Sequence, residues 1–286
     1  MNIDQGAVSV GDVALAYRSV GEGRHLVIVH GGPGLGHTYM RPLDRWAAEF
    51  LLIYYDQRGS GHSPVGDSTK LGLTSAIQDL EQLRKGLGID RANLVGHSFG
   101  ALLALMYAVR HPDGVGALVL LNPAPPFVPE LAEQLGSNMA ARRTKDIDDE
   151  REAIASSDAF REGDPKAVER FILNVYQPFF KDPRTAEILN LGFTDISAKT
   201  VLELEERWFE ELFSLDPVSV LAHIRCPTLV VYGQLDPTPS EFARLLAERV
   251  PSAELVILPD AGHFAHVEDP EPLAEAVLPF LRVRAL

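Results

Sequence analysis

One pentapeptide places a potential nucleophile in a recognisable setting. Residues 96–100 read Gly-His-Ser-Phe-Gly, which matches the pattern G-x-S-x-G. A short apolar run at residues 93–95 precedes it, and a helical apolar run at residues 101–108 follows it. A strand, a tight turn and a helix are the context in which this motif raises a serine hydroxyl above the edge of a sheet. The flanking glycines avoid a collision with the neighbouring strand and helix. The pattern therefore predicts that Ser98 is a nucleophile.

A serine hydroxyl is a weak nucleophile, so it needs a base to take its proton and an acid to hold that base. In this setting the acid and then the histidine follow the serine along the chain, each at the end of a later strand. Asp236 follows an apolar run that ends at Gly233, and His263 follows one that ends at Leu258. We therefore expect Ser98, Asp236 and His263 to form a catalytic triad.

Two other residues compete for these roles. Asp260 is a rival acid, but it lies too close to His263 in the same loop to orient the imidazole easily. His266 is a rival base, and packing at the approach to the last helix explains it better. His263 and His266 also form H-x-x-H, but no carboxylate or cysteine ligand pattern accompanies them. We therefore expect no metal site.

Acyl transfer also needs N–H donors for an oxyanion. One donor is expected from Phe99, the residue after the nucleophile, and the other from the loop after an early buried strand. HGGPG at residues 30–34 is such a loop, and its Gly32 can turn an N–H toward the oxyanion with no side chain in the way. The loop matches neither G-x-G-x-x-G nor G-x-x-x-x-G-K-[ST], so the alternative of a phosphate-binding loop has little support.

The elements that must position these residues alternate along the chain. Apolar runs predict strands at residues 8–17 (with a turn at 11–12), 25–29, 50–55, 93–95, 117–121, 226–233 and 254–258. Helical periodicity predicts helices at about residues 39–50, 74–86, 101–108, 240–249 and 272–283. In the second of these helices, Ser75 and Gln78 have the spacing of a capping box. The alternation predicts an α/β protein with a mostly parallel central sheet and helices on both faces, and ligands bind at the carboxyl ends of such strands.

The strand pattern stops between Pro125 and about Phe213. This segment is charged, contains many prolines, and has helical periodicity at residues 167–176 and 200–213. We expect a core made of residues 1–122 and 216–286, with residues 123–215 inserted as a helical cap.

Composition excludes several classes of function. The chain has 286 residues, of which 46% are hydrophobic and 23% charged, and its formal net charge is −14. An acidic surface disfavours nucleic acid as a partner. No apolar run approaches the length of a membrane span, and the first residues lack the basic and apolar regions of a signal peptide. Cys226 is the only cysteine, which excludes an intrachain disulfide. These features predict a cytoplasmic protein without a membrane partner.

Four stretches together resemble the α/β-hydrolase superfamily and, within it, the prolyl iminopeptidase family. They are HGGPG at residues 30–34 with Tyr39 beyond it, DQRGSGHS at 56–63, DLEQLR at 79–84, and the G-x-S-x-G motif at 96–100. The pairing of HGGPG with DQRGxGxS is far more specific than G-x-S-x-G alone. The resemblance covers roughly residues 20–122 and 216–286.

The resemblance implies an α/β-hydrolase fold and a role for each candidate residue. Ser98 is the implied nucleophile, Asp236 the acid, His263 the base, and Gly32 and Phe99 the donors of the oxyanion hole. The family releases an N-terminal proline from peptides and needs no cofactor. Its DQRGxGxS segment implies a structural role for residues 56–63.

Two features of the chain differ from the family. The family's motif usually reads Gly-Gly-Ser-Trp-Gly, whereas His97 and Phe99 stand here. The family binds the substrate amine with acidic residues near tryptophans in the cap. The nearest stretch is residues 203–211 around Trp208, where a solvated helix face, with Glu203 in capping-box spacing from Thr200, is the favoured interpretation.

The first functional hypothesis is a serine hydrolase that acts as a prolyl-iminopeptidase-like aminopeptidase on small peptides. The alternative keeps the triad and changes the substrate to a small ester or amide, a lactone, or a carbon–carbon bond next to a ketone. A third hypothesis, from another class, is a non-catalytic ligand-binding protein on the hydrolase scaffold. The sequence indicates no oligomeric state.

Overall fold

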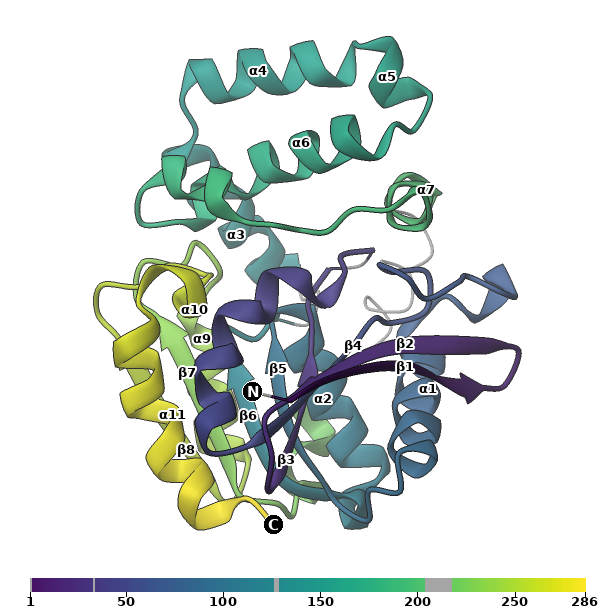
Figure 1. Ribbon diagram of the computed structural model, residues 1–286. Helices are drawn as coiled ribbons and strands as arrows, with labels where there is room; N and C mark the ends of the chain where they lie inside the picture. Colours follow the sequence, from purple (N-terminus) through teal and green to yellow (C-terminus); the bar gives the residue numbers. More distant parts are fainter. Residues whose placement is uncertain (1, 33, 126–128, 204–217) are drawn as a thin grey trace.

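The computed structural model describes residues 2–32, 34–125, 129–203 and 218–286 (Figure 1). Within these ranges, eight strands form one sheet in the order β1-β2-β4-β3-β5-β6-β7-β8. The strands are β1 Ile3–Val10, β2 Val13–Val20, β3 His25–Val29, β4 Leu51–Tyr55, β5 Ala92–His97, β6 Val115–Leu121, β7 Thr228–Gly233 and β8 Ala253–Leu258. Each predicted strand is present, and β3 has the predicted bounds.

The pairing of the strands divides the sheet into two parts. β1 and β2 form an antiparallel hairpin through a turn at Gly11, whose φ of +58° suits glycine, and β2 also pairs antiparallel with β4. From β4 to β8 all neighbours are parallel. The predicted fold class, an α/β protein with a mostly parallel central sheet, is confirmed.

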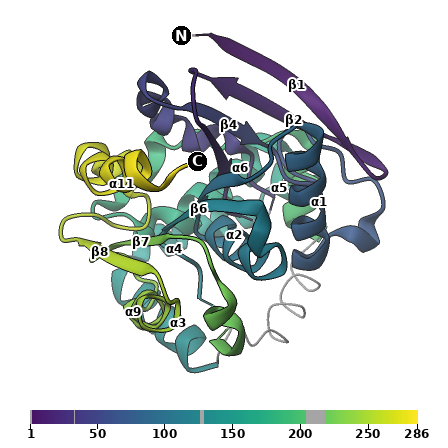
Figure 2. The same ribbon diagram turned by 90° about the horizontal axis from the view of Figure 1, so that it is seen from below.

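Helices cover both faces of the sheet. α1 (Leu73–Gly86), α2 (Phe99–Arg110) and α9 (Ser240–Arg249) pack on one face, while η1 (His37–Ala48) and α11 (Pro270–Arg284) pack on the other, as Figure 2 shows along the strands. Alternate residues of one strand face opposite layers: Leu26 and Ile28 join the core with η1 and α11, whereas Val27 and Val29 join the core with α1 and α2. Burial on both faces explains why these strands read as continuous apolar runs.

A layer of helices lies beyond the carboxyl ends of the parallel strands (Figure 1). It consists of α3 Pro129–Arg142, α4 Lys145–Ala155, α5 Asp158–Arg161, α6 Pro165–Tyr176, η4 Gln177–Phe179, η5 Pro183–Ile188 and α7 Asp195–Glu203. Residues 129–203, all of them described, contain no strand, as the loss of the apolar-run pattern predicts.

Two capping boxes predicted from the sequence are wrong. α1 begins at Leu73 after Gly72, so Ser75 lies inside the first turn and does not cap it. α7 begins at Asp195, so Thr200 lies within this helix and is not its start. Most of the acidic stretch at residues 203–211, including Trp208, lies outside the described residues.

The loop at residues 56–63 connects the sheet to the helical layer. The Gly61 N–H donates to Ser197 Oγ at 2.8 Å, and Thr194 Oγ1 donates to the Gly61 carbonyl at 2.6 Å. Asp56 holds the loop from inside, since its carboxylate accepts from the backbone N–H of His37 and of His62, both at 2.9 Å. These contacts give the DQRGSGHS segment a structural role beside the strand ends.

Among the described residues, no helix combines the length and apolarity that a membrane span requires.

Candidate active site

The turn between β5 and α2 holds Ser98 in an unusual backbone conformation. Its φ is +55° and its ψ is −122°, a combination that L-residues rarely adopt. The turn is packed so closely that an added Cβ at Gly100 would lie 2.1 Å from the Val29 carbonyl oxygen, and one at Gly96 would lie 2.5 Å from the Gly100 carbonyl oxygen. Both glycines are therefore required sterically, as the motif predicts.

The carboxylate of Asp236 has partners on both oxygens. Oδ2 lies 2.6 Å from His263 Nδ1 and accepts from Asn122 Nδ2 at 2.7 Å, while Oδ1 accepts from the Thr238 N–H at 2.8 Å. An ionised carboxylate only accepts, so His263 carries its proton on Nδ1. Its Nε2 is then free to receive a proton from another group.

The backbone around His263 is fixed by the helical layer. Its N–H donates to the Phe179 carbonyl at 2.9 Å, and the preceding Gly262 N–H donates to Glu268 Oε2 at 2.9 Å. The other oxygen of Glu268 accepts from the Lys181 N–H at 2.6 Å. Burial raises the pKa of Glu268 even though these two bonds oppose it. The segment at 179–181 is thus joined to the loop that carries His263.

Ser98 and His263 line the same cavity, which has a volume of about 120 Å³. The rest of its described lining is Ala124, Pro125, Ala132, Leu135, Phe179 and Thr238. Two of these residues come from α3, and Phe179 also packs its ring 5.0 Å from the imidazole of His263. No acidic side chain is among the described residues that line it. The space beside Ser98 is therefore small and apolar within the part of the chain that the structure describes.

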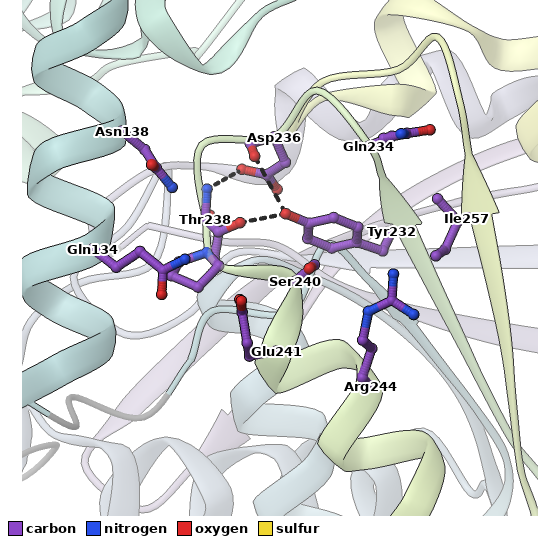
Figure 3. A pocket seen from close by; sticks show the side chains of 11 residues that line it. Gln134, Asn138, Tyr232, Gln234, Asp236, Thr238, Ser240, Glu241, Arg244 and Ile257 are labelled. Carbon is purple, nitrogen blue, oxygen red and sulfur yellow. Dashed lines mark hydrogen bonds between the residues drawn. The ribbon is translucent and has the colours of Figure 1, made fainter.

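A second, polar cavity of about 340 Å³ is lined by Asp236 and Thr238 together with Gln134 and Asn138 of α3 (Figure 3). Thr238 lines both cavities. Asn138 of α3 donates to the Pro237 carbonyl at 2.9 Å, and the Tyr232 hydroxyl donates to the Asp236 carbonyl at 3.2 Å. These contacts hold the backbone of the loop that carries Asp236.

The loop after β3 reaches the nucleophile. An added Cβ at Gly31 would lie 3.1 Å from Ser98 Cβ, so this loop passes directly beside the serine. Gly32 has a φ of +123°, a conformation available to glycine. Phe99 is the first residue of α2, and the partial positive charge at a helix N-terminus favours an anion there. The predicted oxyanion donors thus lie in the two segments that border Ser98.

The two rival residues are placed elsewhere. Asp260 forms an exposed ion pair with Lys181 Nζ at 3.2 Å. His266 is buried, with its ring centroid 5.6 Å from that of Tyr39 and 4.9 Å from that of His97, and neither of its ring nitrogens has a hydrogen-bond partner among the described residues. Within the described ranges, no three or more His, Cys, Asp or Glu side chains form a group that could hold a metal ion.

Sequence reasoning did not assign a role to Asn122 or Phe179. Asn122 follows the last residue of β6 and has a φ of +44°, so it occupies the same kind of strand-end position as Asp236. Its place directly after a predicted strand could have identified Asn122 as a candidate site residue. Phe179 lies in the helical layer, where no sequence pattern indicates which side chain will reach the cavity.

The sequence of this chain is similar to a family model and to several known proteins. The family model described as "alpha/beta hydrolase fold" matches residues 24–270. The proline iminopeptidase of Heyndrickxia coagulans is 25% identical over 91% of this chain and 91% of its own length. That of Saccharolobus solfataricus is 28% identical over 93% of this chain and 87% of its own length.

The crystal structure of a proline iminopeptidase-related protein from Thermus thermophilus is also similar. It is 30% identical, has a TM-score of 0.75, and the alignment covers 100% of this chain and 99% of that one. Together with the curated relatives, it confirms the resemblance stated from the sequence motifs.

Proposed function

Because the chain belongs to the α/β-hydrolase fold family, we propose that it is a serine hydrolase with Ser98 as its nucleophile. The observation that carries the proposal is the contact of 2.6 Å between His263 Nδ1 and Asp236 Oδ2, made by a histidine that shares the wall of one cavity with Ser98. Among the candidate residues, this pair has the geometry of an oriented base.

The proposed reaction proceeds through an acyl-enzyme. Ser98 Oγ attacks the carbonyl carbon of the substrate, and His263 Nε2 takes the hydroxyl proton while Asp236 holds the imidazole. His263 then gives that proton to the leaving group, and a water molecule repeats the sequence to release the acyl group. The N–H groups of Gly32 and Phe99 are the proposed donors to the oxyanion, and loss of one such donor typically lowers kcat by about 10²–10³.

The lining of the cavity supports a small apolar acyl group as the substrate portion held beside Ser98. Apart from Thr238 and the two catalytic residues, its described lining is apolar. A free ammonium group would need carboxylates facing it, because a buried unpaired charge is costly. We therefore propose a small ester with an apolar acyl portion as the preferred substrate class.

Release of an N-terminal proline, the activity that the sequence predicts first, is the second candidate. It is favoured by the proline iminopeptidases that are 25% and 28% identical over most of this chain. The apolar lining also suits a pyrrolidine ring. This candidate also requires acidic side chains that bind the substrate amine, and the described lining of the cavity supplies none.

A substrate panel tests both candidates. Wild type and Ser98→Ala are assayed with p-nitrophenyl acetate and butanoate, with proline p-nitroanilide, and with its N-acetylated form. Ester turnover that disappears in Ser98→Ala supports the main proposal. Fast turnover of the free proline anilide with rejection of the N-acetyl form would establish the second candidate instead. Equal turnover by both proteins would refute Ser98 as the nucleophile.

A further inference from the structure

Three hydrogen bonds connect Gly31, Tyr39, His97 and His263, one after another, into a hydrogen-bonded series. The Gly31 N–H donates to the Tyr39 hydroxyl oxygen at 2.6 Å, and that oxygen lies 2.9 Å from Nδ1 of His97. Nε2 of His97 lies 2.9 Å from the carbonyl oxygen of His263. Tyr39 is 2% exposed and His97 is 1% exposed, and neither lines the cavity at Ser98. The proposed reaction does not use either side chain.

The hydrogens of this hydrogen-bonded series can be assigned in one consistent way. Burial, together with the neighbouring His263 and His266 rings, holds the pKa of His97 well below its ordinary value, so its ring is neutral. A backbone carbonyl only accepts, so the N–H of His97 is on Nε2. Nδ1 therefore accepts from the Tyr39 hydroxyl, whose pKa is raised by burial. In this hydrogen-bonded series, every donor therefore faces an acceptor.

The hydrogen-bonded series connects the segments at the ends of three strands. Gly31 lies in the loop after β3, next to the proposed oxyanion donor Gly32. His97 is the last residue of β5 and directly precedes Ser98. His263 lies in the loop after β8. An added Cβ at Gly31 would lie 3.0 Å from the Tyr39 hydroxyl, which shows how closely this loop is packed against the tyrosine.

We propose that Tyr39 and His97 are positioning residues, which fix the oxyanion loop and the backbone of His263 relative to Ser98. This inference rests on the serine-hydrolase function proposed above. It adds the residues that keep the oxyanion loop, Ser98 and His263 at fixed positions relative to one another. His97 suits the role because an imidazole presents an acceptor and a donor on opposite sides of one rigid ring. A glycine, which the resembling family usually has at this position, can make neither side-chain bond.

Another role for His97, as the base itself, conflicts with its contacts. Both of its ring nitrogens are already bonded, one to Tyr39 and one to the His263 carbonyl. His263, in contrast, has its Nδ1 bonded to Asp236 and lines the cavity with Ser98. His97 therefore acts through His263 and the oxyanion loop.

Tyr39→Phe is the direct perturbation. It removes the hydroxyl and leaves the Gly31 N–H and the His97 Nδ1 buried without their partner. A catalytic group displaced by about 1 Å costs about 10²-fold in rate, and a lost oxyanion donor costs about 10²–10³. We therefore expect kcat to fall by about 10- to 100-fold while KM stays unchanged, because the cavity lining is intact.

Tyr55→Phe is the matched control. Tyr55 is 1% exposed, and its hydroxyl has no hydrogen-bond partner within the part of the chain that the structure describes. Its removal deletes a buried phenolic oxygen of the same kind without breaking a bond, so kcat should not change. At position 97, Gln retains a donor that can reach the His263 carbonyl and Leu does not, so His97→Gln should keep more activity than His97→Leu.

The experiment measures kcat and KM on p-nitrophenyl butanoate, with each rate divided by the concentration of active sites titrated by a fluorophosphonate. This division removes the effect of misfolded protein. A lower kcat per titrated site in Tyr39→Phe, with Tyr55→Phe at the wild-type value, supports the inference. A wild-type kcat per site in Tyr39→Phe would overturn it, as would equal losses in both tyrosine variants. Undiminished turnover by Ser98→Ala would instead refute the serine-hydrolase proposal on which the inference rests.

Discussion

Enlarging the cavity beside Ser98 should change which acyl chain the protein prefers. Leu135 lies on α3 and lines this cavity, whose volume is about 120 Å³. A small cavity with an almost entirely apolar lining suits a short acyl chain. We expect wild type to be most active on butanoate and less active on longer esters. Leu135→Ala removes the end of a side chain from the cavity wall and makes room for longer chains.

The size of the effect follows from the transfer of apolar groups. Each buried methylene contributes about 0.8 kcal/mol, which is about a fourfold change in kcat/KM. Leu→Ala opens space for about two further methylenes, so the ratio of kcat/KM for hexanoate to that for butanoate should rise about 16-fold over wild type.

A series of p-nitrophenyl esters from acetate to octanoate measures this ratio. Leu131→Ala is the matched control, because Leu131 lies on the same helix but packs against the main hydrophobic core. It loses the same group without opening the cavity, so its chain-length profile should match wild type. An unchanged profile in Leu135→Ala, or the same shift in both variants, would refute the assignment of this cavity to the acyl group.

Two further predictions concern the framework of the site. Gly100→Ala places a Cβ 2.1 Å from the Val29 carbonyl oxygen, so we expect a loss of about 3 kcal/mol or more in the free energy of unfolding, measured with urea; wild-type stability would contradict the described turn. Burial alone would raise the pKa of Asp56, but the hydrogen bond from the His37 side chain, the electrostatic attraction of His37 and His30, and the His62 N–H outweigh it and lower this pKa to about 2. A lowered carboxyl pKa stabilises the fold above the unfolded-state value near 4 and ceases to do so as the pH falls toward 2, a contribution of about 2 kcal/mol. Urea unfolding between pH 7 and pH 2.5 should therefore show a weaker loss of stability in Asp56→Asn than in wild type, and equal losses would contradict this assignment.

The sheet could be predicted from the sequence because its strands are buried on both faces. Residues 25–29 are almost entirely apolar, and β3 has these bounds in the structure. The strand–turn–helix around Ser98 was equally clear, since α2 has no polar face over residues 99–108 and all of these are buried. Local pattern and tertiary burial agree in these elements.

Contacts between distant parts of the chain could not be predicted. Asn122 bonds to Asp236 across 114 positions, and no local pattern links the two residues. The His97 ring nitrogens find their partners on η1 and on the loop after β8, so the side chain's role depends on the packing of three separate segments. The lining from α3 was also hidden, because residues 129–142 mix apolar and polar side chains without a clear core-facing stripe.

The capping box predicted at Ser75 failed for a physical reason, although the helix itself begins within one residue of its predicted start. α1 begins after Gly72, whose backbone carbonyl accepts from the Ala76 N–H, and no side chain caps it. Ser75 has the spacing of a capping residue but lies within the first turn, because Leu73 and Ile77 must both be buried against the sheet. Burial of the apolar residues, and not the capping motif, sets where this helix begins.

The central claim is that Ser98 is the reactive nucleophile and depends on His263. Peptide mass spectrometry after treatment with a fluorophosphonate tests it most directly. The proposal expects one adduct, on the peptide that contains Ser98, with no adduct in Ser98→Ala and much slower labelling in His263→Ala. An adduct on another residue of the wild-type protein, or labelling of His263→Ala at the wild-type rate, would contradict it.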